Sequence, residues 1–361
     1  MTPPRAAPCV LVTGGLGYIG SHTVVALAGH GYRVVVVDDL SNSSIDVLAP
    51  VEALCGTSVA TYCGDVRDRE FLATVLGRNP VACAVHFAGL KAVGDSVRMP
   101  LEYYDVNVNG TLTLARALEA AGVRRVVFSS SATVYGDPAV APTPETHPLA
   151  PANPYGRSKR DAEELLADLC ASDPRWGAIS LRYFNPAGAH PSGTIGERPQ
   201  GVPNNLVPYI AQVANGERPA LRVFGDDYPT PDGTGVRDYV HVMDLASAHV
   251  AAVARMLSRP GNEVINLGSG RGYSVLEVIR AYEHANDVRV PYEIVPRRSG
   301  DVPRYLADAT LAGQLLDWRA TRGIDEMCRD AARFQRMHVQ RAPRPARTPA
   351  SSPNRALSPA S

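Results

Sequence analysis

Three side chains have the types and the spacing of a proton-transfer set. Tyr155 and Lys159 lie four residues apart, directly after an Asn-Pro pair at 153–154 that is typical of the start of a helix. Residues at positions i and i+4 share one face of a helix. The third residue is Ser131, which lies just past the end of a predicted strand. We therefore expect a serine, a tyrosine and a lysine to meet at one site.

These three residue types predict acid–base chemistry on a hydroxyl group. A phenol with a pKa near 10 is a poor base at neutral pH. Lowering that pKa by about 3 units requires roughly 4 kcal/mol of preferential stabilisation of the phenolate. The Lys159 ammonium and a cationic, oxidised nicotinamide could supply it together. Tyr155 would then remove a proton from a substrate hydroxyl while hydride leaves the same carbon, and Ser131 would hydrogen-bond that oxygen and relay the proton.

A glycine-rich turn near the N-terminus predicts a dinucleotide cofactor. Gly14, Gly17 and Gly20 follow an apolar run at 9–12 and lead into a helix-like segment at 21–28. A tight turn, a close approach to a pyrophosphate and close helix–strand packing each require a residue without a side chain. The start of the helix also offers free N–H groups to phosphates. Because such turns often only join a strand to a helix, the motif alone is weak.

Asp38 narrows the cofactor to NAD. It ends a second predicted strand at 33–37, about 20 residues past the glycine turn, where an acidic side chain accepts hydrogen bonds from the adenine ribose. A carboxylate there would repel a 2′-phosphate, and no arginine follows in the next few residues. We therefore predict NAD rather than NADP.

The pattern of apolar segments predicts an α/β fold of Rossmann type: a doubly wound parallel sheet with a smaller, mixed C-terminal substrate-binding lobe. Near-continuous apolar strands that alternate with helices are typical of a parallel sheet covered on both faces. The carboxyl ends of such strands carry the site, so the glycine turn and Ser131 are expected at one edge. The predicted strands are 9–12, 33–37, 59–62, 81–87, 125–129 and 178–183, and the predicted helices are about 19–29, 67–77, 101–121 and 156–171.

Composition changes along the chain predict its domains. We expect a short extension at 1–8, an NAD-binding domain at 9–185 and a second, substrate-binding lobe at 186–338, where proline and glycine become frequent. Some later segments, at about 240–267, are expected to return to the first domain. The basic tail at 339–361 is rich in Pro, Ala and Ser, and it is predicted to be disordered.

Bulk composition excludes several function classes. Lys plus Arg equals Asp plus Glu, at 36 each, so nothing points to nucleic acid. Six scattered cysteines without a C-x-x-C pair indicate reduced thiols and no metal site. No apolar run approaches the ~20 residues that a membrane span needs, and the N-terminus does not read as a signal peptide. We expect a soluble, cytoplasmic protein.

Seven segments resemble the extended short-chain dehydrogenase/reductases and, among them, the UDP-glucose 4-epimerase family. They cover most of the chain in order, and together they are highly specific: 13–20, 86–93, 129–136, 154–159, 182–186, 204–210 and 233–239. The resemblance implies inversion at C4 of UDP-galactose or UDP-glucose. Hydride would pass from C4 to NAD, and the resulting 4-keto sugar would turn over in the pocket and take the hydride back on its other face. NAD is then regenerated in each cycle and should stay tightly bound.

The resemblance also implies the site residues. The catalytic set is Ser131, Tyr155 and Lys159. The cofactor is expected to contact Gly14, Gly17, Tyr18, Ile19, Gly20, Asp38, Asp39, Leu40, Asn42, Ser43, Asp65, Val66, Phe87, Ala88, Gly89, Lys91, Asn107, Tyr155, Lys159 and Phe184. The UDP-sugar is expected to contact Ser131, Tyr155, Asn185, Asn205, Leu206, Arg222, Val223, Phe224, Arg237, Arg298, Asp301 and Tyr305.

Some of these positions carry further expectations. Asp65 should end the third strand and meet the adenine amino group. Arg237 and Arg298 suit a pyrophosphate because a guanidinium makes bidentate, charge-assisted hydrogen bonds. Asp39 departs from the asparagine that bacterial relatives often have. Tyr305 matches a position that limits pocket size, which implies rejection of N-acetylated sugars. Family analogy further implies a homodimer formed through the helices around 101–121 and 156–171.

Other functions remain to be weighed. A sugar-nucleotide 4,6-dehydratase needs an acid pair beside the Ser/Thr, but Ala132 and Thr133 occupy those positions. An epimerase for UDP-xylose and UDP-arabinose, or one of broad specificity, stays open. A non-catalytic NAD-sensing or scaffold protein should have lost Tyr155 or Lys159, yet both are present.

Overall fold

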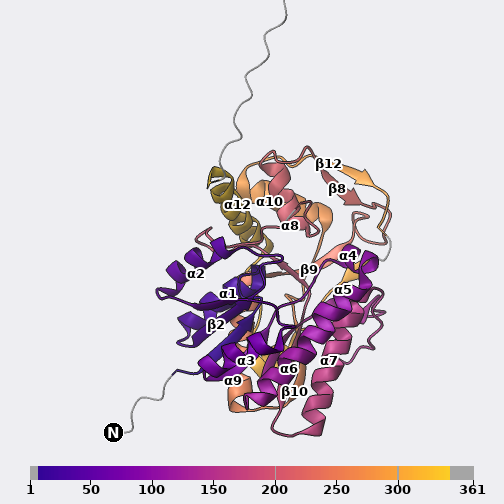
Figure 1. Cartoon of the computed structure of the whole chain (residues 1–361). Coiled ribbons are helices and arrows are strands. Elements are labelled where there is room, and N and C mark those ends of the chain that lie inside the picture. Colours follow the sequence, from indigo (N-terminus) through magenta and orange to yellow (C-terminus); the bar gives the residue numbers. More distant parts are fainter. Residues whose placement is uncertain (1–6, 200, 299–300, 342–361) are drawn as a thin grey trace, which may run out of the picture.

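The computed structural model describes residues 7–199, 201–298 and 301–341, and its central element is a parallel sheet of seven strands (Figure 1). The strand order is β10-β6-β5-β4-β1-β2-β3, so the winding direction reverses between β1 and β4. The predicted α/β fold is confirmed, and the first six strands lie within two residues of the predicted bounds. They are β1 (Cys9–Thr13), β2 (Arg33–Asp38), β3 (Ala60–Cys63), β4 (Val81–His86), β5 (Arg125–Ser131) and β6 (Gly177–Tyr183), followed later in the chain by β10 (Asn262–Leu267).

Helices cover both faces of this sheet. Along β1, Val10 and Val12 belong to the apolar cluster under α1 (Tyr18–Gly29) and α9 (Val242–Ser258). Leu11, between them, belongs to the cluster on the opposite face. The helices of that face are α3 (Arg69–Arg78), α6 (Gly110–Ala120) and α7 (Pro154–Ser172). Because both faces are buried, the central strands contain continuous apolar runs, such as Val34 to Val37 in β2.

Four helical segments differ from the prediction. The expected helix at 101–121 consists of α5 (Pro100–Tyr104), a π-helical turn η2 (Asp105–Asn109) and α6. The helices α2 (Leu48–Cys55) and α4 (Val93–Arg98), and the 3₁₀ turn η1 (Ile45–Val47), were not predicted. Pro50 lies in the first turn of α2, where its missing N–H breaks no helical hydrogen bond. The proline therefore does not prevent that helix.

The second lobe contains small sheets and three packed helices. Strand β9 (Val236–His241) pairs in parallel with β7 (Asn185–Ala187) and β13 (Arg304–Tyr305) and antiparallel with β11 (Gly272–Ser274). A separate parallel pair joins β8 (Leu221–Phe224) to β12 (Tyr292–Val295). The helices α8 (Leu206–Ala214), α10 (Val275–Asn286) and α12 (Ile324–Arg341) share one apolar core and lie together at the upper end of Figure 1. The remaining elements are η3 (Ala132–Tyr135) and α11 (Thr310–Leu316).

Two segments of the C-terminal half bear on the predicted domain bounds. Strand β10 pairs with β6 along its whole length, from Asn262 opposite Ala178 to Leu267 opposite Tyr183, so this strand belongs to the large sheet. Helix α12 continues to Arg341. Residues 339–341 are therefore helical, and the predicted disordered tail begins too early. Residues 342–361 lie outside the described part of the chain.

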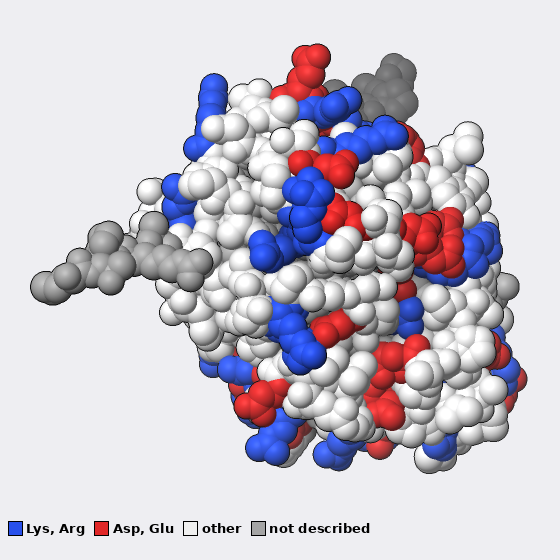
Figure 2. Space-filling view, turned by 90° about the horizontal axis from the view of Figure 1, so that it is seen from below, with Lys and Arg blue, Asp and Glu red and all other residues white. Residues whose placement is uncertain are grey.

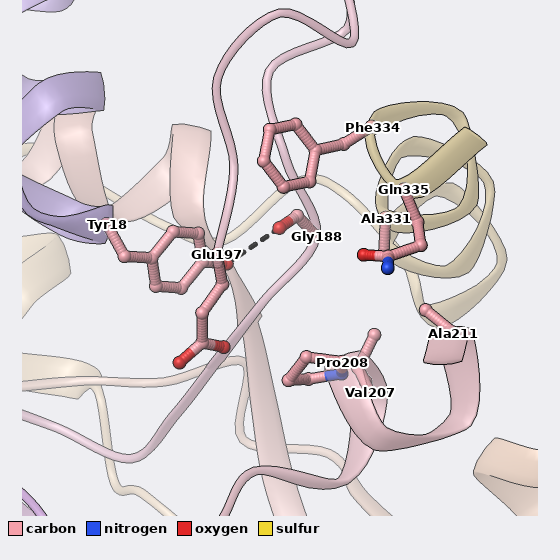
Figure 3. Close-up of a pocket in the computed structure, with 9 residues that line it drawn as sticks. All are labelled: Tyr18, Gly188, Glu197, Val207, Pro208, Ala211, Ala331, Phe334 and Gln335. Carbon is pink, nitrogen blue, oxygen red and sulfur yellow. Dashed lines mark hydrogen bonds between the residues drawn. The ribbon is translucent and has the colours of Figure 1, made fainter. Parts of the chain in front are cut away.

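The two units meet at the first residue of α1. The Tyr18 hydroxyl donates a hydrogen bond to the carbonyl of Gly188 at 2.8 Å. Around this contact, residues of α1, α8 and α12 line a small pocket (Figure 3). The helix that follows the glycine turn is thus fixed directly to the second lobe.

Charges of both signs are interspersed on the molecular surface. On the face shown in Figure 2, Lys and Arg side chains lie beside Asp and Glu side chains, in keeping with a composition of 36 residues of each sign. Within the described ranges, we find no helix that is both long and apolar enough to cross a bilayer.

Candidate active site

The glycine turn between β1 and α1 forms a cradle that side chains would fill. Gly14 has φ +69°, and a Cβ built on it would lie 2.8 Å from the backbone nitrogen of Ala88. A Cβ on Gly20 would lie 2.1 Å from the carbonyl oxygen of Gly14. Gly17 occupies the N-cap position of α1 and provides no side-chain cap. The first N–H groups of α1 therefore remain available to an anionic ligand.

Asp38 fastens this cradle to the end of β2. Its Oδ2 accepts the N–H of Leu16 at 2.9 Å, while Oδ1 accepts the Leu40 N–H at 3.0 Å and the Ser43 hydroxyl at 2.7 Å. An ionised carboxylate offers about four acceptor sites, so one remains for a ribose hydroxyl. Leu40 adopts φ +62° to make this loop, and Asp39 instead accepts from Ser41 at 2.9 Å.

Asp65 does not lie where the sequence predicted. Strand β3 ends at Cys63, two residues earlier. The Asp65 carboxylate pairs with the guanidinium of Arg67 at 2.6 Å, and this hydrogen bond, opposed by partial burial, holds the pKa of Asp65 below its usual range. Arg67 therefore already occupies acceptor positions of the Asp65 carboxylate, which was expected to contact the adenine amino group. Val66, beside it, is buried.

The loop after β4 crosses the glycine turn. The backbone N–H groups of Phe87 and Ala88 donate to the carbonyl of Thr13 at 3.0 and 3.1 Å. Asn107, in the π-helical turn, accepts the Leu90 N–H at 2.8 Å and donates to the Leu90 carbonyl at 3.1 Å. A π-helical turn within a longer helix is frequent at functional sites. Here it aims an amide at the loop that carries Gly89 and Lys91.

Ser131, Tyr155 and Lys159 meet near this loop. Ser131 is the last residue of β5, and its hydroxyl accepts a hydrogen bond from Thr133 Oγ1 at 2.9 Å. Helix α7 begins as predicted, since Asn153 accepts the N–H of Gly156 at 2.9 Å. A Cβ on Gly89 would lie 3.5 Å from Lys159 Nζ.

The pKa shifts show what the protein's own groups contribute at Tyr155. Burial is the largest influence and raises the pKa of Tyr155, while a hydrogen bond from Ser131 and the positive charge of Lys91 lower it. Lys159 was expected to lower this pKa, but its ammonium donates to the carbonyl of Ser129 at 2.9 Å. Burial lowers the pKa of Lys159 to about 8, against the opposing charge of Glu163. Lys91 is thus a further cation that acts on the phenol, and the sequence analysis did not assign it this role.

A buried ion pair supports α7, and the sequence analysis missed its acidic member. Glu163 and Arg182 meet at 2.5 Å with side chains 6% and 4% exposed. The Ser130 hydroxyl also donates to Glu163. Glu163 lies one turn after Lys159, so the helical spacing from Tyr155 and Lys159 is a signal that could have found it. The pair fixes the face of α7 that carries the candidate base.

The predicted sugar-nucleotide residues fall into two groups. Phe184, next to Asn185 of β7, packs against Tyr305 with ring centroids 5.2 Å apart, and the Tyr305 hydroxyl donates to the carbonyl of Ala132. This contact brings them next to Ser131. The second group surrounds Phe224 of β8.

In that second group, Arg298 lies over the Phe224 ring at 4.5 Å. Asp301 contacts Arg298 at 3.0 Å and Arg237 at 3.6 Å. Arg222 also lies over the Phe224 ring, at 5.4 Å, and faces Glu293 at 3.9 Å. Not every predicted residue joins the group, because Val223 is buried away from the surface. Asn205 and Leu206 begin α8.

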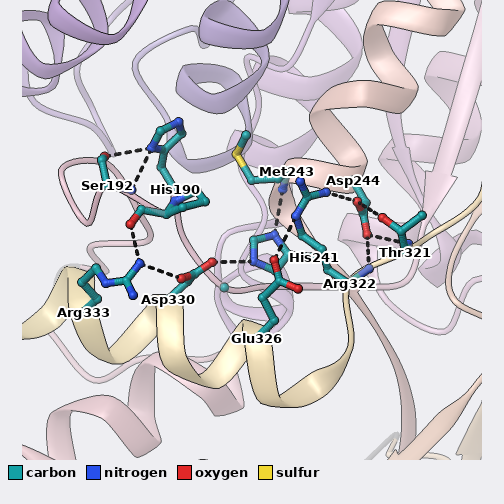
Figure 4. A network of polar contacts seen from close by, with 12 residues as sticks. His190, Ser192, His241, Met243, Asp244, Thr321, Arg322, Glu326, Asp330 and Arg333 are labelled. Carbon is teal, nitrogen blue, oxygen red and sulfur yellow. Dashed lines mark hydrogen bonds and ion pairs between the residues drawn. The ribbon is translucent and has the colours of Figure 1, made fainter. Parts of the chain in front are cut away.

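A candidate cation site is better explained by a hydrogen bond. Among the described residues, His241, Glu326 and Asp330 have ligand atoms within 4.8 Å of one another (Figure 4). The Met243 N–H donates to His241 Nδ1 at 3.0 Å, so a neutral ring carries its proton on Nε2. That nitrogen faces Asp330 at 3.3 Å. The lone pair that a cation would need is therefore protonated, and the cluster links β9 to α12.

Comparisons with known proteins cover nearly the whole chain. A family model described as GDP-mannose 4,6 dehydratase matches residues 11–331. The UDP-glucose 4-epimerase of Yersinia pestis is 53% identical over 335 residues, which are 92% of this chain and 99% of that protein. The UDP-glucose 4-epimerase of Bacillus subtilis is 52% identical over 330 residues, which are 91% and 97% of the two chains.

Solved structures agree with these relatives. The UDP-glucose 4-epimerase of Stenotrophomonas maltophila with bound NAD and formylated UDP-arabinopyranose matches with a TM-score of 0.91 and 49% identity. The Bifidobacterium longum enzyme in complex with NAD+ and UDP matches with a TM-score of 0.89 and 49% identity. Both matches cover 92% of this chain and 99% of the other.

We expect Gly20→Ala to reduce the NAD that co-purifies with the protein to about a tenth or less, a change that corresponds to roughly 1.4 kcal/mol. The added Cβ would meet the backbone of Gly14, which cannot move aside without opening the cradle. Absorbance and mass analysis of the purified protein measure the effect. Gly29→Ala, at the end of the same helix with nothing within 4 Å of its Cβ, is the matched control. Equal NAD content in both variants would contradict this account of the cradle.

Proposed function

The chain belongs to the extended short-chain dehydrogenase/reductases and, within them, to the UDP-glucose 4-epimerase family, and we propose that it interconverts UDP-galactose and UDP-glucose by inversion at C4. The observation that carries this proposal is that Tyr155 lies beside Ser131 and Lys159 lies beside the loop after β4, in a chain matched along its length to epimerases. The reaction would serve galactose metabolism.

The cofactor is NAD, as in the crystallised relatives, and the glycine cradle fits it. Gly14 and Gly20 leave room for backbone to approach a pyrophosphate, and Asp38 keeps an acceptor site for a ribose hydroxyl. When bound, NAD supplies a hydride acceptor that is restored within each turnover. Because nothing is consumed, tight retention of the cofactor favours turnover.

Tyr155 acts as the base in the proposed reaction and returns the same proton at its end. Its phenolate takes the proton of the C4 hydroxyl, and Ser131 hydrogen-bonds the same oxygen. Burial raises the pKa of Tyr155, so positive charge must stabilise the phenolate, and Lys91 lies near enough to contribute. Lys159 donates a hydrogen bond to the Ser129 carbonyl. It therefore fixes the end of β5 that carries Ser131, and it also contributes a positive charge.

The uridine diphosphate is proposed to bind around Phe224, where Arg237, Arg298 and Asp301 gather. Two guanidinium groups suit a diphosphate. Binding energy gained at the diphosphate does not restrain the hexose ring. The 4-keto sugar can therefore turn over beside Tyr155.

Competing activities within the family are distinguished by a few residues. A dehydratase would need acidic side chains at positions 132 and 133. Here Ala132 is buried, and the Thr133 hydroxyl donates to Ser131. A UDP-pentose epimerase is the second candidate, because the S. maltophila structure contains a UDP-arabinopyranose derivative. UDP-arabinose and UDP-xylose therefore belong in the same assay.

We expect Tyr155→Phe to lower the turnover of UDP-galactose by about 100-fold or more, because general base catalysis contributes at least that factor. A coupled assay for UDP-glucose measures it, with NAD content as a check on folding. Tyr104→Phe is the control and should leave activity unchanged. Tyr104 is half-buried and follows Tyr103, whose ring contacts Tyr155. An unaffected Tyr155→Phe variant would remove the base assignment. A wild-type protein that holds NAD but does not turn over would favour a binding protein.

UDP-N-acetylglucosamine should be turned over at least about tenfold less efficiently than UDP-glucose. The Tyr305 ring is buried against Phe184, and its hydroxyl is anchored on Ala132, so the wall beside the sugar cannot retreat easily. Tyr305→Ala should raise the relative efficiency with the N-acetylated sugar. Tyr292→Ala, at an exposed tyrosine of β12, is the control. Comparable turnover of both sugars by the wild type would refute this selectivity.

We further propose that the protein is a homodimer formed through α6 and α7. The half-buried Leu112, Leu165 and Leu169 line a groove between these helices, and the side chain of Leu101, on the adjacent α5, is 84% exposed. Sedimentation should give about twice the chain mass of 38.5 kDa. Leu165→Arg should yield monomers, while Ile294→Arg, on exposed β12, should not. A monomeric wild type would overturn the assignment.

A cytoplasmic location is proposed on the state of the thiols. All six cysteines are free, as is usual in a reducing compartment. Cell fractionation that recovers the protein outside the cytoplasm would count against it.

A further inference from the structure

Glu197 is a nearly buried acid that the reaction outlined above does not use. Its side chain is 9% exposed and lies beside Tyr18 of α1 and Pro208 of α8 (Figure 3). One oxygen, Oε1, accepts hydrogen bonds from Lys91 Nζ at 2.9 Å and from Asn205 Nδ2 at 2.8 Å. These partners come from the two units of the molecule, so a single carboxylate oxygen joins the nucleotide-binding half to the second lobe.

Lys91 lies on the cofactor side of this link. It ends the loop that crosses the glycine turn and that Asn107 holds at Leu90. Its side chain is half exposed, so packing alone does not fix the ammonium. The charge of Glu197 and its hydrogen bond outweigh the effect of burial and raise the pKa of Lys91. Glu197 is therefore the group that holds the Lys91 ammonium in place.

Asn205 lies on the sugar-nucleotide side of the link. It occupies the N-cap position of α8 with extended backbone, yet its side chain makes no capping hydrogen bond. The amide donates to Glu197 instead. Pro208 is the third residue of this nine-residue helix and has no N–H, so the N–H groups of Leu206 and Val207 are left for another acceptor, and phosphate oxygens suit such groups.

We propose that Glu197 is a positioning residue that couples the two ligand sites by holding Lys91 and Asn205 in their binding geometry. The inference rests on the proposed function for the roles of those two partners. Because both hydrogen bonds end on one carboxylate oxygen, ordering one partner orders the other. Binding of a uridine diphosphate should therefore strengthen retention of NAD, and by thermodynamic reciprocity NAD should strengthen binding of the diphosphate.

The same contact has an electrostatic consequence at Tyr155. The charged or titratable groups that act on Tyr155 or feel its charge are Lys91, Tyr103 and Tyr183. Glu197, which also faces Tyr18, offsets the charge of Lys91. Removing the negative charge while keeping the hydrogen bonds leaves the Lys91 ammonium uncompensated, which favours the phenolate.

The coupling is tested without turnover, by the rate at which purified holoprotein releases NAD with and without UDP. In the wild type, UDP should slow NAD release about tenfold or more, the worth of one charge-assisted hydrogen bond. In Glu197→Ala this effect should be lost, whereas Glu197→Gln should retain most of it. Glu217→Ala is the matched control and should leave the UDP effect unchanged. Glu217 also accepts an amide N–H, from Gln335 at 2.6 Å, but it lies on the exposed surface. A UDP effect that is absent in the wild type, or unchanged in Glu197→Ala, would overturn the proposal.

The electrostatic part is tested by the pH profile of kcat/KM for UDP-galactose. Activity rises with pH as Tyr155 loses its proton, so a lower pKa moves this acid limb to lower pH. We expect Glu197→Gln to shift the limb down by about half a pH unit or more, while Glu217→Gln leaves it in place. An unshifted limb in Glu197→Gln would contradict the charge effect. If the wild type shows no epimerase turnover, the proposed function fails, and the NAD-release measurement still decides the coupling.

Discussion

The contact between the glycine turn and the loop after β4 is the constraint on which the candidate site depends. Gly14 approaches Ala88 so closely that a Cβ would lie 2.8 Å from its nitrogen, and two N–H groups of that loop bond to Thr13. This contact fixes the cofactor cradle on one side and the position of Gly89 and Lys91 on the other. Since Gly89 also borders Lys159, one close backbone approach sets both halves of the chemistry.

Burial makes the site's electrostatics depend on paired charges. It raises the pKa of Tyr155 and lowers that of Lys159 to about 8, both of which disfavour the charged forms. Two buried or nearly buried carboxylates pair with cations near the site. Glu163 pairs with Arg182 beside α7, and Glu197 pairs with Lys91 of the loop after β4. Of these two pairs, only that of Glu197 and Lys91 places a cation that acts on the phenol, whereas the pair of Glu163 and Arg182 supports the helix that carries it.

Sequence patterns predicted elements well and side-chain partners poorly. The first six strands were found because each contains a short apolar run, and the start of α7 because Asn153 and Pro154 are typical of a helix N-terminus. Helix α2 was not among the predicted helices, and its Pro50 lies in the first turn, where it breaks no helical hydrogen bond. Asp65 was expected at the end of β3 because of the resemblance, and nothing in the local sequence spacing revealed its bond to Arg67. Glu197 belongs to no motif, and its partners are 106 and 8 residues away.

The sequence by itself determined the alternation of strands and helices, the glycine positions that a close backbone approach requires, the carboxylate at Asp38 and the presence of Ser131, Tyr155 and Lys159. These follow from local backbone conformation and from the periodicity of apolar residues, which are encoded over short stretches. Only the tertiary structure decided that Lys159 bonds to Ser129 and that Lys91 bonds to Glu197. A buried charge takes whichever partner the packing of distant segments brings within reach, and that packing is a property of the whole chain.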